Sequence, residues 1–501
     1  MASSTLSSTC LSSLTPPART SSAPTTIPAT CFTSTLPISH RAATTLPNSF
    51  ARATEPLQHD EGNEPDSSPP LISCTHPSPP ANHLGRPLAP ISHDDSMKQH
   101  TINTLLALAA ITTVSHAGTA PLADVTTTPA TSWLTPTLDI RARYEFADVD
   151  GLDPSHAFTT RERVGVKTSA WNGFSALVEG EFTQDLVDDY HSGTADTKPS
   201  DAKNSTIADP QNNELNQALI QYSGFDSTVK VGRQRIIYDN AAFIGNVGWR
   251  QNEQTYDAIS LLNTSIPDLT LNYAFIDQVN RIFGEEASGT FQNAPGEIHL
   301  LNASYAGISG LTLGSYIYSM EFDDAGTTGW NNETYGISAK GSLAGLNLHG
   351  ELAFQDEAGP LNDGEGLYAH FNATKALGSQ TLTVGIEHLD AGVQTPLATV
   401  HAFNGYADAT DARRISGDHG GLTDTYASHT LPIFWGMKWT NAAHVFGDNS
   451  ISSDLGFGVD SVLAKKFDDH LTAITKLGYF DTSDALYKST TRVSMELNYS
   501  F

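Results

Sequence analysis

Cysteine is almost absent from this sequence. Its 501 residues include three cysteines, Cys10, Cys31 and Cys74, and none follows Met97. Exported proteins that lack a sufficient core are commonly held together by disulfide bonds. The rest of the chain has no cysteine with which to form such bonds, so a disulfide-stabilised fold is excluded.

Long apolar runs and positive charge are also scarce. No stretch after residue 117 approaches eighteen consecutive apolar residues, so a helical membrane protein is excluded. After the same residue, 48 acidic residues face 22 basic ones, which leaves a net charge of −26. This balance argues against nucleic acid as a partner and against adhesion to anionic lipid through a basic patch.

The first part of the chain has a composition of its own. Residues 1–96 are rich in Ser, Thr and Pro and contain few large apolar side chains. Such a segment cannot bury enough apolar surface to offset the entropy lost on ordering. We therefore expect residues 1–96 to be disordered.

A secretory signal follows at residues 97–117. The stretch MKQHTINTLLALAAITTVSHA has a basic start at Lys98, an apolar run at residues 105–111, and small residues Ser115 and Ala117 at its end. This is the order of regions in a cleavable signal peptide, and the segment is too short and too polar to span a bilayer. Its position predicts that translation starts at Met97 and that residues 1–96 lie upstream of the true start.

An organellar transit sequence is the alternative for the N-terminus. Residues 1–50 contain Arg19 and Arg41 and no acidic residue. A chain with an organellar address would not need a secretory signal behind it, so we favour an exported protein. Its mature chain would begin with a short segment, residues 118–134.

From residue 135 to residue 501 the sequence alternates with a period of two. In LDIRARYEF, residues 138–146, apolar residues alternate with charged ones, and residues 491–501 repeat the pattern with polar and charged residues. Short turns alternate with long loops rich in Gly, Asp, Asn and Pro. These features predict an all-β fold, a transmembrane antiparallel β-barrel of about 16–18 strands in the bacterial outer membrane.

A soluble β-sandwich or β-helix would also have alternating strands. The mean hydropathy of −0.26 is too polar for so many strands unless one face of each strand meets water inside a barrel. Aromatic residues near the strand ends and the secretory signal also favour a barrel, since closure pairs every backbone group. The acidic loops at residues 183–214 and 401–426 are predicted to be solvated outer surface.

The alternation assigns charged side chains to the lumen. Arg141 and Arg143 oppose apolar neighbours on one strand, and Arg161 and Arg163 do so on the next. The third strand presents acids to the same side, at Glu179 and Glu181. Arginine remains charged in any lumen and holds carboxylates bidentately, which suits either a stiffening lattice of ion pairs or a passage for anions.

A long motif lies farther along the chain. VGRQRIIYDNAAFIGNVGWRQNEQTYDA, residues 231–258, places Arg233 and Arg235 on the parity of two valines that face lipid, so a bulge or an inward fold is expected near Gly232. With the partial match FNGYADATDARRISGDHGGLTDTY, residues 403–426, this motif resembles the alginate export family of bacterial outer-membrane porins. The resemblance extends over most of residues 135–501.

The resemblance implies a monomeric barrel of about eighteen strands with an arginine-lined constriction that passes a uronate polymer or a similar anionic saccharide. The matching positions are Arg233, Arg235 and Arg250, with Glu253 and Asp257 as their charge partners. The sequence departs from the family at TDARRISGDHGG, where charged residues replace an expected apolar turn. This departure makes the solute less certain than the fold.

No motif for catalysis, a metal or a cofactor is present. His419, His429, Asp418 and Asp424 lie near two serines, but their spacing specifies no catalytic geometry. HExxH, paired cysteines, phosphate-binding glycine loops and calcium loops do not occur, so only loop carboxylates are expected to bind metal, weakly and without selectivity.

Four functions stay open at this stage. The first is a channel for anionic oligo- or polysaccharides that is surrounded by outer-membrane lipid. The second is a general diffusion porin for small solutes. The other two are a barrel whose lumen is plugged, with its arginines fully paired, and an outer-membrane enzyme with catalytic residues at its rim.

Overall fold

The computed structural model describes residues 132–501 apart from residues 195–196, 286, 288, 325–326, 357–365, 417–419, 449–454 and 486. The segments predicted at residues 1–96 and 97–117, and most of the segment at residues 118–134, lie outside the described residues. Asp418 and His419, two of the residues weighed for a catalytic role, also lie outside the described residues.

The described residues form eighteen strands joined by turns, loops and short helical segments. The strands are β1 (Leu134–Val149), β2 (Ser155–Thr168), β3 (Phe174–Asp189), β4 (Asn212–Gly224), β5 (Ser227–Gln234), β6 (Thr255–Asn263), β7 (Leu269–Asn280), β8 (Asn293–Ile308), β9 (Leu311–Phe322), β10 (Asn332–Leu343), β11 (Leu346–Asp356), β12 (Gly366–Leu377), β13 (Gln380–Leu389), β14 (Leu422–Pro432), β15 (Lys438–Gly447), β16 (Gly456–Lys466), β17 (Leu471–Asp481) and β18 (Thr490–Ser500). The helical segments are η1 (Gly289–Phe291), η2 (Thr328–Trp330), η3 (Val400–Ala402), α2 (Asp411–Ser416) and η4 (Phe434–Gly436). Within this part of the chain, none of the helices has the length and apolar character needed to cross a membrane.

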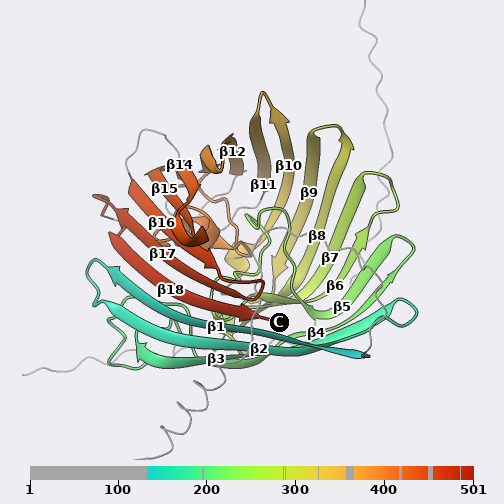
Figure 1. Cartoon of the computed structure of the whole chain (residues 1–501), viewed down its shortest axis with the longest axis horizontal. Helices are drawn as coiled ribbons and strands as arrows, with labels where there is room; N and C mark the ends of the chain where they lie inside the picture. Colours follow the sequence, from blue (N-terminus) through green and yellow to red (C-terminus); the bar gives the residue numbers. More distant parts are fainter. Residues whose placement is uncertain are drawn as a thin grey trace, which may run out of the picture. The chain divides into compact units, whose positions relative to one another are not determined.

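Each strand pairs with its neighbours in sequence, and the sheet closes on itself. β1 pairs antiparallel with β2 along one edge and with β18 along the other, where Asp139 lies opposite Ser500 and Val149 opposite Thr490 (Figure 1). Closure leaves no strand edge unpaired, which a sheet in lipid requires. The predicted fold, a transmembrane antiparallel barrel, is confirmed, and the strand number lies at the upper end of the predicted range.

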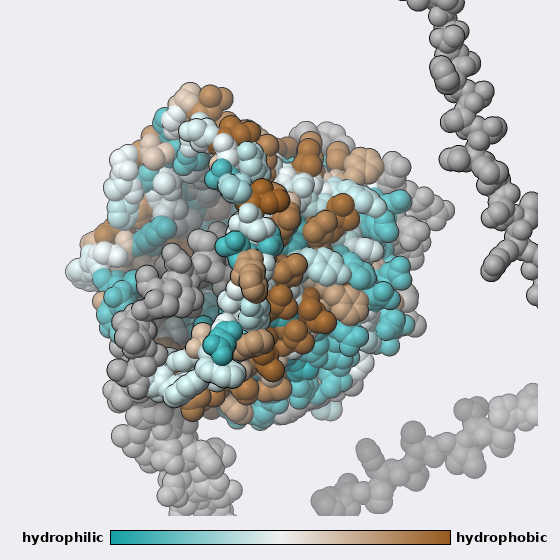
Figure 2. All heavy atoms as spheres, turned by 90° about the vertical axis from the view of Figure 1, so that its right-hand side faces the viewer, coloured by the Kyte–Doolittle hydropathy of each residue, from teal (hydrophilic) through white to brown (hydrophobic). Residues whose placement is uncertain are grey.

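The alternation in sequence becomes an inner and an outer face. Apolar side chains such as Ile220, Val231, Ile259 and Leu301 are 43–60% exposed on the outside, and Figure 2 shows apolar residues gathered over the face it displays. Polar residues of the alternate positions point inward, where many are buried by loops that enter the barrel. This division is the one expected for a wall with lipid outside and polar contents inside.

The connections fall into two classes that lie at opposite rims. Tight turns such as those between β4 and β5 and between β10 and β11 are at one rim, together with the start of β1 and the end of β18. Long loops join the strands at the other rim. In outer-membrane barrels the short turns face the periplasm and the long loops face outward, so we refer to the periplasmic rim and the outer rim.

Two of the long loops run inside the ring of strands. They are the β5–β6 loop, residues 235–254, and the described part of the β13–β14 loop, residues 390–416 and 420–421, seen in green and orange within the barrel (Figure 1). The β5–β6 loop crosses the interior, because Asn302 of β8 donates to Asp239 at 2.6 Å while Arg141 of β1 donates to the carbonyl of Trp249 at 2.7 Å. The two loops contact each other where Gly245 donates to the Leu397 carbonyl.

Gly232 shapes the wall just before the β5–β6 loop. Its φ of +117° is one that residues with a side chain rarely adopt, and a Cβ there would lie 2.2 Å from the carbonyl oxygen of Ala218 on β4. The register nevertheless continues through Gly232, as far as Arg233 with β4 and as far as Gln234 with β6. The inward fold expected near Gly232 is therefore present, but it begins at Arg235.

Candidate functional site

The tip of the β5–β6 loop is bound by arginines of β1. Arg141 donates to three consecutive carbonyls of the loop, those of Gly248, Trp249 and Arg250, at 3.1, 2.7 and 2.9 Å. Arg143 also donates to the carbonyl of Trp249. These two guanidinium groups, placed on the inner face by the alternation of β1, hold the loop against the wall.

A cluster of carboxylates surrounds the same tip. Arg143 is fully buried and lies 3.0 Å from Asp209 and 3.5 Å from Glu496. Arg250 lies 3.3 Å from both Glu145 and Asp408. Burial would raise the pKa of Asp209, but Arg143 and Arg250 hold it below its usual value.

Trp249 joins the two inward loops. Its indole stacks on the His401 imidazole with ring centroids 3.3 Å apart and planes 14° from parallel. The Arg250 guanidinium lies over the indole at 4.1 Å, and the Lys476 ammonium lies over it at 4.8 Å. Aromatic rings attract cations on their faces, so Trp249 is fixed by ring stacking and by charge.

Glu253 is the centre of a second cluster at the end of the β5–β6 loop. It accepts hydrogen bonds from Arg235 at 2.7 Å, Asn246 at 2.6 Å and Asn216 at 2.8 Å, and Arg163 lies 3.5 Å away. Burial opposes ionisation of Glu253, yet Arg163 and Arg235 hold its pKa well below the usual range. The carboxylate therefore remains charged and ties the loop to β2 and β4.

The two acids predicted on β3 belong to this second cluster. Glu181 accepts from Arg163 and from the backbone N–H of Glu253. Glu179 accepts from Asn216 at 3.0 Å and Gln217 at 2.9 Å and lies 3.9 Å from Arg235. Both glutamates are on the inner face and are more than nine-tenths buried.

Arg161 has fewer partners than the other arginines. It is 1% exposed and is paired with Asp139 across β1 and β2. Its Nε and Nη1 atoms have no hydrogen-bond partner among the described residues. Arg235 differs in being accessible, since a third of its side chain is exposed.

Arg233 and Asp257 lie on the outer face of the barrel, which corrects the prediction that they line the lumen. They are directly opposite each other on β5 and β6 and alternate in step with the exposed Val231 and Ile259. Arg233 donates to Asp257 at 2.8 Å and to Glu285 of the β7–β8 loop at 3.0 Å. The prediction was wrong because the strand keeps its alternation through Gly232.

Several partners of the arginines were missed in the sequence. Asp209 and Asp408 lie in the two acidic loops predicted to be solvated, yet Asp209 is fully buried and the Asp408 side chain is 5% exposed. Their loops fold over the barrel interior, which a count of acidic residues cannot show. The aromatic Trp249 inside the matched motif was the signal that could have indicated a packed loop.

We expect acid to weaken the contact between the two loops. Burial lowers the pKa of His401 to about 3, in spite of the carboxylate of Asp408 2.6 Å from its Nδ1. Neutral His401 therefore stabilises the fold fully above its ordinary pKa of 6.5, and this contribution is lost as the pH falls toward 3. The apparent melting temperature should fall over this range in the parent and fall less in His401→Gln, and equal pH dependence in the two proteins would contradict the expectation.

Comparisons with known proteins agree with the barrel fold. The family model described as alginate export matches residues 132–276, which include β1 to β6, the β5–β6 loop and most of β7. Among solved structures, Pseudomonas aeruginosa OpdQ has a TM-score of 0.55 at 12% identity over 74% of this chain and 98% of its own. Acinetobacter baumannii OccAB4 has a TM-score of 0.56 at 10% identity, with coverages of 74% and 98%. No curated protein matches the chain.

The fold and these matches define the class of protein as a barrel of the outer-membrane porin type. The predicted resemblance to the alginate export family is confirmed by the family match over residues 132–276. The matched segment contains both arginines that bind the loop tip and the Glu253 cluster. The likeness to the solved structures concerns the fold, because sequence identity is low.

Proposed function

We propose that this protein is a monomeric outer-membrane channel through which anionic saccharides, uronate oligomers or polymers, diffuse after export of the chain by the signal at residues 97–117. The supporting observation is the distribution of charge along the inner wall. Besides Lys466 on β16, which pairs with Asp469, four inward-facing lysines lie within three residues of the periplasmic rim: Lys167 on β2, Lys230 on β5, Lys340 on β10 and Lys438 on β15. Within the same three residues of the rim, no inward-facing position of the described strands is Asp or Glu.

These four lysines have no carboxylate within ion-pair distance among the described residues, unlike the arginines of the loop clusters. Lys230 lies on the same wall as Lys167 and the accessible Arg235. A basic mouth raises the local concentration of anions and lowers the barrier for their entry. The excess of acid in the chain lies farther from this rim, much of it in the outer loops, so it does not oppose entry from the periplasm.

The arginines divide into two roles in this proposal. Arg141, Arg143, Arg163 and Arg250 hold the β5–β6 loop, which narrows the lumen. Arg235 remains accessible and contacts the solute together with the lysines of the wall. Solute carboxylates would pass along this wall by exchanging one cationic partner for the next.

The proposal is tested by ion selectivity in planar bilayers. We expect Lys230→Ala combined with Arg235→Ala to lower the ratio of anion to cation permeability several-fold, as read from the reversal potential in a KCl gradient. Arg233→Ala is the matched control, since it removes an arginine two residues away on the outer face. Equal selectivity in the double variant and the parent would overturn the proposal.

The solute is tested in the same bilayers. A uronate oligomer should block the parent channel at lower concentration than a neutral oligosaccharide of equal length. OpdK, another structure of this fold with a TM-score of 0.53 at 12% identity over 73% of this chain and 99% of its own, was solved with vanillate. Block by vanillate and not by the uronate oligomer would favour a channel for small carboxylates.

A further inference from the structure

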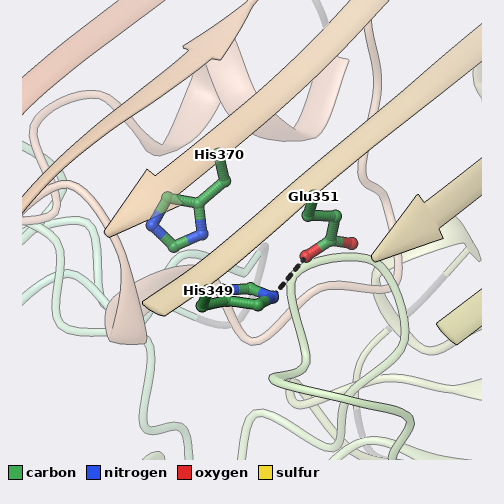
Figure 3. A group of neighbouring side chains, drawn as sticks. All are labelled: His349, Glu351 and His370. Atoms are coloured by element: carbon green, nitrogen blue, oxygen red, sulfur yellow. Dashed lines mark ion pairs between the residues drawn. The ribbon is translucent and has the colours of Figure 1, made fainter. Parts of the chain in front are cut away.

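Three side chains on the inner wall, away from the arginine clusters, converge on one point. His349 and Glu351 are two residues apart on β11 and therefore point to the same face, and Glu351 lies directly opposite His370 on β12. Figure 3 shows the two imidazoles and the carboxylate turned toward one another. One nitrogen or oxygen from each residue lies within 4.8 Å of the others.

The converging atoms have no hydrogen-bond partner in the described part of the chain. They are His349 Nε2, Glu351 Oε2 and His370 Nδ1, all shielded from solvent. Glu351 is 4% exposed and His370 is 7% exposed. Buried polar atoms in folded proteins are nearly always satisfied, so three unsatisfied atoms that face one another indicate a shared ligand.

The other polar atoms of two of these residues are already engaged. Tyr316 donates its hydroxyl to Glu351 Oε1 at 2.8 Å, and His370 Nε2 lies 3.0 Å from the Tyr426 hydroxyl. When His370 carries its proton on Nε2, its Nδ1 lone pair points at the other two groups. Residues that bind metals are commonly oriented in this way by hydrogen bonds to their remaining atoms.

We propose that His349, Glu351 and His370 bind a divalent transition-metal ion, with Zn²⁺ as the best match. Two imidazole nitrogens and one carboxylate oxygen form a donor set that zinc favours, whereas Mg²⁺ and Ca²⁺ prefer oxygen alone. His349 Nε2 and Glu351 Oε2 are 3.7 Å apart, so small rotations bring both within about 2.1 Å of a common ion. The fourth position of a tetrahedral ion is left for water or an anionic group.

This inference is independent of the proposed function and was not predicted in the sequence analysis, which expected metal only at loop carboxylates. The His-x-Glu pattern at residues 349–351 was visible, but the third ligand comes from a neighbouring strand. Lys340 lies opposite His349 on β10. Its side chain is exposed, yet its positive charge acts on His349 and Glu351, so the three ligands must bind the ion against this repulsion.

The experiment is a Zn²⁺ titration of the protein purified in detergent from cells that express the full chain, after treatment with a chelator. Competition with a chromophoric chelator should show one ion bound per chain. His370→Ala and Glu351→Gln should each weaken binding by more than about 10-fold, and Tyr316→Phe should weaken it by about 10-fold or more. Co²⁺ should give the visible absorption of a tetrahedral site in the parent.

His299→Ala is the matched control. His299 is also a strand histidine 3.4 Å from a glutamate, Glu297, but both side chains are exposed. Its Zn²⁺ affinity should equal that of the parent. The heat-dependent shift in gel mobility that marks a folded barrel shows whether each variant is folded. Absence of binding to the folded parent, or equal binding by the parent, His370→Ala and Glu351→Gln, would overturn the proposal.

Discussion

Arg143→Met is expected to conduct several-fold more current than the parent channel. Arg143 is fully buried, binds the carbonyl of Trp249, and faces Asp209, Glu496 and Glu145. Removing the cation takes one partner from each of these buried carboxylates and leaves them with Arg250, Arg141 and Arg492, and breaking a buried ion pair costs up to about 3–5 kcal/mol. The loop tip is the movable part of this contact, so it should leave the wall and widen the lumen.

Single-channel conductance in planar bilayers measures this effect. Arg233→Met is the control, because Arg233 pairs with Asp257 on the outer face and does not touch the loop tip. The shift in gel mobility on heating separates a loosened loop from an unfolded barrel. An unchanged conductance in a folded Arg143→Met barrel would show that the loop is held in place without Arg143.

The second large effect is expected from Glu253→Gln. Glu253 is the carboxylate shared by Arg163 and Arg235, and its low pKa keeps it ionised. The glutamine fills nearly the same volume but carries no charge, so Arg163 keeps only Glu181 as an anionic partner and Arg235 keeps only Glu179, 3.9 Å away. Arg235 is accessible from the lumen, and the ratio of anion to cation permeability should rise several-fold.

Asp257→Asn provides the comparison for Glu253→Gln. This substitution also removes the carboxylate partner of an arginine, here Arg233, but on the outer face of β6. Its reversal potential in a KCl gradient should match that of the parent. Raising the ionic strength should reduce the difference between Glu253→Gln and the parent, because salt screens charges exposed to water. If Glu253→Gln and Asp257→Asn both have the parent's ratio of anion to cation permeability, Arg235 does not face the conducting path.

The clusters also explain why a highly acidic chain concentrates arginine near its β5–β6 loop. A loop that crosses a barrel interior brings carbonyl groups that need donors, and a guanidinium offers five in a fixed geometry. Arg141 alone satisfies three carbonyls. In the proposed function, the stiffening role and the transport role of the arginines are therefore assigned to different residues.

Much of this architecture is determined by the sequence alone. The period-two alternation in segments such as residues 138–146 decides which side chains of a strand share a face, because the pleat allows only two directions. That local rule gives the inward direction of Arg141, Arg143, Arg161 and Arg163. Together with the turn residues between the strands, it also predicts the barrel. The motif at residues 231–258 further identified the family resemblance and the loop that turns inward.

Tertiary structure decided what those inward side chains touch. Asp209, Asp408 and His401 come from loops distant in sequence, and their burial depends on the path of each loop across the lumen. The outward position of Arg233 depended on whether Gly232 interrupts the strand, and hydrogen bonds to both neighbouring strands keep it continuous. His370 meets His349 and Glu351 only through the register of β11 and β12. Such contacts depend on long-range pairing and closure, and a periodic pattern in one strand contains no information about its neighbour's register.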